Sequence, residues 1–99
     1  MAVIYHITSE KDWQRALEKG FYDCPSLSAE GFIHCSEENQ VEGVLSRYFK
    51  GQDDLVKLII DTDRLVHPLK YELAPSINQE FPHIYGTLNL DAVLQVVKV

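Results

Sequence analysis

The segment Gly31-Phe32-Ile33-His34-Cys35-Ser36 is a short apolar run with a histidine inside it. Two other runs have the same character, Val3-Ile4-Tyr5-His6-Ile7-Thr8 near one end of the chain and Phe81-Pro82-His83-Ile84-Tyr85-Gly86 toward the other. Histidine is neither a strong strand former nor a usual core residue. Three of the four histidines nevertheless lie in predicted strands. This pattern indicates strands that converge on a polar site within an apolar frame.

The pattern around these runs predicts one α+β domain over residues 1–99. Runs of apolar and β-branched residues bounded by turn residues indicate strands. The expected strands are residues 3–7, 31–35, 55–60, 69–73, 83–85 and 94–99. Residues 55–60 have the composition of a central strand, whereas Pro68 keeps the next strand at a sheet edge. Because both helices come early, the order β-α-β-α-β-β-β-β favours a mixed sheet over a doubly wound fold.

Capping residues predict where the two helices begin and end. Ser9 has the position of a helix N-cap, and Gly20 has the position of a C-cap. The second helix is expected to begin at Ser36 and to end at Gly51, with an apolar stripe between them. The expected loops, which are polar and contain proline, are residues 21–30 and 74–82.

Composition narrows the class of protein. The 99 residues are 45% hydrophobic and 24% charged, which is typical of a folded soluble domain. The net charge of −6, from 9 basic and 15 acidic residues, disfavours nucleic acid and anionic membranes as partners. No apolar run approaches the roughly 20 residues that span a bilayer, and residues 1–6 do not resemble a secretory signal. Two cysteines in such a chain are expected to be reduced thiols, so we expect a cytoplasmic protein.

Strand geometry decides which of the candidate side chains can meet, because alternate residues face opposite sides of a strand. The pairs that share a face are His6 with Thr8, His34 with Ser36, and His83 with Tyr85. All three pairs can project into one cleft, where a neutral imidazole serves as donor, acceptor or base. The alternative is that each histidine is a hydrogen-bonded structural residue or a surface residue.

Two residues near this predicted cleft have two interpretations each. Ser36 caps the second helix, or it lies at a helix N-terminus that binds an anion such as a pyrophosphate; the two roles are compatible. Glu72 shares a strand face with Lys70. It is either a catalytic carboxylate or a solvated strand residue.

Other site chemistries have little support. The chain has no Cys-x-x-Cys or His-Glu-x-x-His spacing, so no metal site is expected. It has neither a glycine-rich dinucleotide fingerprint nor a phosphate-binding Gly-Lys-Ser/Thr loop. Cys35 is expected to be a small buried residue, and Cys24 is expected in a loop.

Several of these segments together resemble a small bacterial and plant family catalogued as domain of unknown function 952. The segments that carry the resemblance are residues 4–7, 31–36, 48–51, 54–56, 70–72 and 81–86. The family has no established activity. Its fold is understood to be similar to that of the ADP-ribosyltransferases, a split mixed sheet that holds NAD in a central cleft. The resemblance therefore implies that the histidine-lined face is a nucleotide cleft.

One branch of that wider fold has a histidine on the first strand, a tyrosine or other polar residue on the second, and a late glutamate. By resemblance, His6 matches the first position and orients the adenosine-side ribose, while His34 and Ser36 lie at the second. No glutamate lies in the last strands, where His83 and Tyr85 are found instead. Glu72, from an earlier strand, is the candidate substitute.

The resemblance implies an NAD or ADP-ribose-like small-molecule ligand and, for an enzyme, glycosyl-type transfer or hydrolysis. In that interpretation the ligand-binding residues are His6, Thr8, His34 and Ser36, and the catalytic residues are His83, Tyr85 and Glu72. The rival hypothesis is a noncatalytic ligand-binding or protein-interaction module on the same fold. The missing late carboxylate favours the rival, because a carboxylate stabilises the positive charge that develops on the ribose. An RNA-modifying role is a third hypothesis, disfavoured by the acidic charge.

Overall fold

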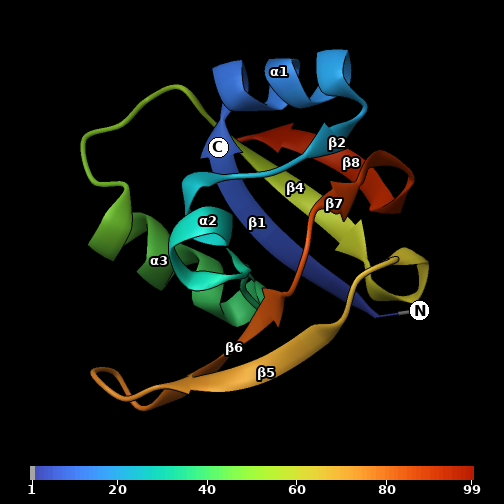
Figure 1. Ribbon diagram of the computed structural model, residues 1–99. Helices are drawn as coiled ribbons and strands as arrows, with labels where there is room; N and C mark the ends of the chain where they lie inside the picture. Colours follow the sequence, from blue (N-terminus) through green and yellow to red (C-terminus); the bar gives the residue numbers. More distant parts are fainter. Residues whose placement is uncertain (1) are drawn as a thin grey trace.

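The apolar run predicted as a central strand forms β4 (Leu55–Asp61), in the middle of a three-stranded sheet. The structure, a computed structural model, describes residues 2–99. β4 pairs on one side with β1 (Val3–Ser9) and on the other with β8 (Val93–Lys98). Both pairings are antiparallel, and the β4–β8 ladder has an irregularity at Ile59 and Ile60. We call these three strands the first sheet (Figure 1).

A second three-stranded sheet carries the other two histidine runs. Its order is β3 (Ile33–His34), β6 (Gln79–Ile84) and β5 (Leu69–Ala74). The long β5–β6 hairpin lies at the opposite end of the molecule from α1 (Glu10–Lys19) in Figure 1. A two-stranded pairing joins β2 (Phe21–Tyr22) to β7 (Leu88–Asn89). Every strand pairing in the described chain is antiparallel, so the α+β class is confirmed, while the expected mixed sheet is wrong.

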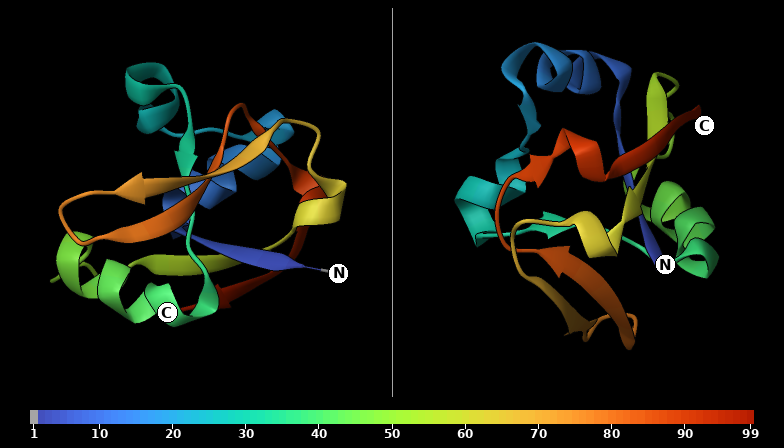
Figure 2. Two further views of the ribbon diagram at one scale, coloured as in Figure 1. Left: turned by 90° about the horizontal axis from the view of Figure 1, so that it is seen from below. Right: turned by 90° about the vertical axis from the view of Figure 1, so that its right-hand side faces the viewer.

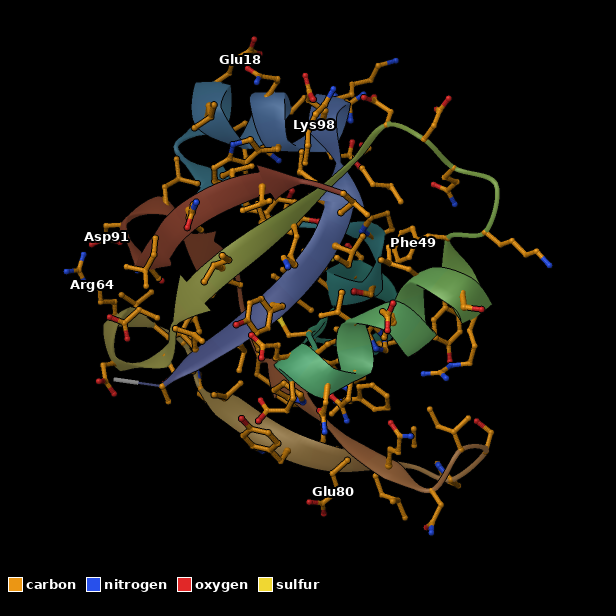
Figure 3. The ribbon with its side chains drawn as sticks, turned by 180° about the vertical axis from the view of Figure 1, so that it is seen from behind. Glu18, Phe49, Arg64, Glu80, Asp91 and Lys98 are labelled. Atoms are coloured by element: carbon orange, nitrogen blue, oxygen red, sulfur yellow. The ribbon has the colours of Figure 1, made fainter. Side chains whose placement is uncertain are left out.

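The main core lies between the two sheets, which Figure 2 shows as separate layers. Its fully buried members come from both: Ile4, Leu58 and Ile60 from the first sheet, Ile33 and Ile84 from the second. A smaller cluster on the other face of β1 contains Tyr5 and Ile7, packed against α3 (Val41–Tyr48). Figure 3 looks at this face, with α3 beside β1. Opposite faces of β1 thus serve two cores.

Two regions expected to be loops contain regular structure. Residues 21–30 hold β2 and a short helix, α2 (Pro25–Glu30), with a proline in its first turn and Gly31 in the left-handed conformation at its end. Residues 74–82 include most of β6. Pro82 is tolerated inside β6 because of the direction in which it faces. Its carbonyl oxygen accepts from the Cys35 N–H, just past the end of β3, so the side of Pro82 that lacks an N–H faces away from β5. The β5–β6 ladder therefore loses no hydrogen bond.

The second helical segment begins later than expected. Ser36 exchanges two backbone hydrogen bonds with Tyr5 of β1, at 2.8 and 2.7 Å, so it is not a helix residue. A 3-10 turn (Glu38–Gln40) follows and leads into α3, which ends at Tyr48 rather than at Gly51. Glu37 provides the cap, and its backbone N–H donates to Gln40 Oε1 at 2.8 Å. Two further 3-10 turns are Thr62–Arg64 and Leu90–Ala92. No helix in residues 2–99 is long and apolar enough to cross a membrane.

The predicted caps of α1 are confirmed. The Asp12 backbone N–H donates to Ser9 Oγ at 3.1 Å, and Gly20 ends the helix with φ of 92°.

We expect Ser9→Ala to lower the free energy of unfolding by about 1 kcal/mol, because the Asp12 N–H loses its hydrogen-bond partner. Urea denaturation measures the change. Ser46→Ala on exposed α3 surface is the control; equal effects of the two changes would contradict this role for Ser9.

Candidate functional site

The backbone bridge between Tyr5 and Ser36 brings the two sheets together at the site. It ties β1 to the segment that leaves β3, so that His6 lies beside the backbone of His34. His34 is in turn directly opposite His83 in the β3–β6 ladder. Residues on neighbouring strands that face each other in this way project to the same side. Three strands thus deliver three histidines to one place.

His6 is 7% exposed and has both ring nitrogens engaged. Nδ1 bonds to the carbonyl oxygen of His34, and Nε2 lies 2.8 Å from the Tyr22 hydroxyl. The Tyr22 hydroxyl is also 3.0 Å from Thr8 Oγ1. Burial lowers the pKa of His6 to about 4, so the ring is neutral at pH 7.

The partners of His6 fix its tautomer. A carbonyl oxygen only accepts, so Nδ1 carries the proton and Nε2 accepts from the Tyr22 hydroxyl. The Thr8 hydroxyl then donates to Tyr22, which completes a chain from Thr8 through Tyr22 and His6 to the His34 backbone. Burial also raises the pKa of Tyr22. The chain is therefore a neutral, fully bonded network that holds β1, β2 and β3 together.

His34 and His83 form a different arrangement, built around Phe32. The Phe32 ring stacks on His83 with centroids 4.0 Å apart and planes at 14°, and it meets His34 edge-on at 4.8 Å. The two imidazole centroids are 5.1 Å apart. The His34 side chain is 53% exposed, whereas that of His83 is 12% exposed. His83 is thus held firmly, and His34 stands at the edge of the group.

Each of these two histidines is bonded to a carboxylate. His83 Nδ1 lies 2.8 Å from Glu72 Oε1, and His34 Nε2 lies 2.7 Å from Glu30 Oε2. The Tyr85 hydroxyl donates to the same Glu72 oxygen. The hydrogen bonds from Tyr85 and His83 lower the pKa of Glu72, and the Glu72 bond raises the pKa of Tyr85. A carboxylate that accepts from an imidazole orients the ring and stabilises its protonated form.

A cavity of about 730 Å³ opens in front of the histidines. Its lining includes the polar groups of His6, Thr8, Tyr22, His34, Ser36 and His83. It also includes apolar side chains, among them Val44 of α3 and Leu73, Ala74 and Phe81 of the β5–β6 hairpin. The described lining contains neither lysine nor arginine, and its one carboxylate, Asp12, is paired with Arg15 at 2.6 Å. An apolar cavity with a few convergent polar groups has the character of a small-molecule site.

The structure brings together five of the seven predicted site residues on the cavity wall: His6, Thr8, His34, Ser36 and His83. Glu72 and Tyr85 are not part of the lining; they contact His83 and each other from the side. The interpretation of Ser36 as a helix cap or a helix N-terminal anion site is wrong, because its backbone is bonded to β1. Its side chain nevertheless lines the cavity.

Tyr22 and Glu30 are site residues that the sequence did not indicate. Tyr22 lies in a two-residue strand that has no periodic pattern, and it is 16 positions from His6. Glu30 ends α2, four positions before His34. The acidic residue at this spacing from a predicted site histidine is the sequence feature that could have indicated the contact.

The two cysteines lie as expected. Cys35 is buried, which raises its pKa, and Cys24 precedes α2 with its sulfur 3.1 Å from Ser26 Oγ. No cluster of three or more metal-ligating side chains occurs in residues 2–99.

The fold and the cavity define a small α+β domain with a histidine-lined site, and comparisons place it in a family. A family model described as a protein of unknown function, DUF952, matches residues 7–96. The chain belongs to this family. No curated protein matches the chain.

Solved structures of CC0527 from Caulobacter crescentus are similar to this chain over nearly its whole length. The X-ray crystal structure has a TM-score of 0.88 at 31% sequence identity, covering 98% of this chain and 85% of CC0527. The solution NMR structure has a TM-score of 0.84 at 31% identity, covering 100% of this chain and 85% of CC0527. At this level of similarity the two proteins share the same fold.

Proposed function

We propose that the histidine-lined cavity binds a nucleotide of the ADP-ribose type, such as NAD, on a fold like that of the ADP-ribosyltransferases. The observation that carries the proposal is the convergence of three histidines from β1, β3 and β6 on one cavity. The cavity volume, about 730 Å³, is within the range of small-molecule sites. The apolar side chains of the lining provide contact area for a planar base, and the hydroxyls of Thr8 and Ser36 provide partners for a ribose.

His6 has a positioning role in this proposal. Both of its ring nitrogens are already bonded, so it acts through Tyr22 and through the backbone of His34 rather than by direct donation to ribose. His83 has the arrangement of a proton acceptor: Nδ1 is bonded to Glu72, and Nε2 has no partner within residues 2–99. Glu72 is likewise a positioning residue, which orients the ring and stabilises the imidazolium.

The reaction that these groups would support is hydrolysis or transfer at the ribose of NAD. The bond from ribose C1′ to the nicotinamide nitrogen breaks, and its electron pair leaves with neutral nicotinamide. The ribose then carries oxocarbenium character until a water oxygen, or another acceptor hydroxyl, bonds to C1′. His83 Nε2 takes the proton that this nucleophile releases, and Glu72 balances the resulting charge.

A specific observation favours a second candidate, nucleotide binding without turnover. Glu72 Oε1 accepts from both His83 and Tyr85, and Glu72 is not part of the cavity lining. Its carboxylate therefore stabilises the ribose cation less directly than one facing C1′ would. In this candidate the same residues bind the ligand, and no bond is broken.

We expect ADP-ribose to bind the cavity, and Ala74→Trp to weaken its affinity at least tenfold, because an indole at this lining position fills the space. Isothermal titration calorimetry measures the affinity. Leu94→Trp, on the exposed surface of β8, is the matched control and should bind as the natural chain does. Equal affinity of the two variants, or no binding of ADP-ribose or NAD at millimolar concentration, would overturn the proposal. Nicotinamide release from NAD distinguishes the enzyme from the binding module.

A further inference from the structure

We infer that His34, held by Glu30, is the position at which a phosphoryl group of the ligand binds, and that it binds this group only as an imidazolium. The inference rests on the proposed nucleotide function and assigns the anionic part of the ligand to one end of the cavity. A diphosphate needs positive charge or several N–H donors. The described lining contains no lysine or arginine, so its histidines are the groups able to become cationic.

The three histidines differ in their ability to supply this charge. His6 is buried with both nitrogens bonded, and burial lowers its pKa to about 4. His83 is 12% exposed and stacked against Phe32. A phosphoryl group beside this ring would lose most of its hydration. His34 is 53% exposed at the edge of the group, so a phosphoryl group there keeps part of its water. The geometry therefore favours His34.

The Glu30 contact gives His34 a defined donor. Nε2 bonds to Glu30 Oε2 at 2.7 Å, so Nε2 carries a proton in both charge states of the ring. Nδ1 has no partner within residues 2–99. In the neutral ring Nδ1 is a lone pair, which repels a phosphoryl oxygen; in the imidazolium it is an N–H that donates a charge-assisted hydrogen bond. Binding of the phosphoryl group thus requires one proton.

Charged and titratable groups surround His34 on several elements. Glu30 of α2 bonds to its ring, and His83 of β6 meets it edge-on at 5.1 Å. Behind His83 lie Glu72 and Lys70 of β5, with Lys70 Nζ 4.9 Å from the Tyr85 ring centroid. From β1, His6 contacts the His34 carbonyl and is uncharged at pH 7. Of these groups, Glu30 is the one hydrogen-bonded to the His34 ring.

The test compares ADP-ribose with adenosine by calorimetry at several values between about pH 5.5 and about pH 8.5, the range in which imidazoles titrate. Each phosphorus of ADP-ribose carries one ester and one anhydride bond and keeps a single strongly acidic oxygen, so the charge of ADP-ribose stays constant over this range. We expect the ratio of the two affinities to fall about tenfold or more as the pH rises, the size of one charge-assisted hydrogen bond. His34→Asn should remove this pH dependence, and Glu30→Gln should reduce the ratio at low pH.

The control for net charge is Glu18→Gln on α1, far from the β5–β6 hairpin in Figure 3, and it should leave the ratio unchanged. A ratio that does not depend on pH, or a His34→Asn variant that keeps the natural dependence, overturns the inference while the nucleotide proposal stands. If neither probe binds at any pH, both the nucleotide proposal and this inference are overturned.

Discussion

The natural chain is expected to lose about 3 kcal/mol more of its free energy of unfolding on acidification than a His6→Gln variant does. Burial lowers the pKa of His6 from 6.5 to about 4, so between these values the unfolded chain binds a proton that the folded chain does not. The contribution of His6 to stability is therefore complete above about pH 6.5 and is lost as the pH falls toward 4. A shift of this size corresponds to about 3 kcal/mol.

Glutamine is the informative substitution because its amide N–H₂ can donate to the His34 carbonyl and its oxygen can accept from Tyr22, without titrating. Urea denaturation at pH 7 and pH 4 measures the free energy of unfolding. The stability advantage of the natural chain over His6→Gln should shrink by about 3 kcal/mol on acidification. His67→Asn, at the exposed fourth histidine, should follow the natural chain. Parallel loss of stability in the natural chain and in His6→Gln would contradict the account of His6.

His83→Asn is expected to lower the rate of nicotinamide release from NAD by about 10²- to 10⁴-fold, the usual contribution of a general base. The same change should alter the affinity for ADP-ribose by no more than about threefold, because it removes a proton acceptor and leaves the cavity open. Stopped-time assays of nicotinamide, together with calorimetry, separate the two effects. His67→Asn again serves as the matched control.

Glu72→Gln tests whether this carboxylate acts through His83. Without this acceptor the His83 ring loses the partner that orients it, so kcat should fall while KM for NAD stays within about threefold. A purely structural role for Glu72 would change KM and kcat together. For the His83→Asn variant, the contradicting result is a loss of ADP-ribose affinity as large as its loss of rate. That result would rule out the catalytic role of His83.

Alternation along strands is the part of the site that could be predicted from the sequence. The placement of His6 with Thr8 on one face of β1, and of His34 with Ser36 beyond β3, follows from a period of two. The central position of β4 and the edge position of β5 follow from the apolar run and from Pro68. These features depend only on neighbours in the sequence, and they can therefore be predicted from it.

Features that depend on contacts across the fold could not be predicted in this way. Pro82 is accommodated inside β6 because the side of it that lacks an N–H faces Cys35, where β3 has already ended. No local sequence pattern indicates where a partner strand ends. α2 did leave local signals, Pro25 in its first turn and Gly31 after its last, but its six residues show no apolar period. Tyr22 lies in β2, which pairs with the distant β7, and its hydroxyl contacts His6 of β1.

The most direct test of the three-histidine nucleotide site is an NMR titration of the natural chain with ADP-ribose, followed at the imidazole ring resonances. The account predicts saturable shifts of His34 and His83, which line the cavity, with a smaller shift of the buried His6 ring and none of His67. Shifts confined to His67, or no ring shift at millimolar ligand, would contradict it.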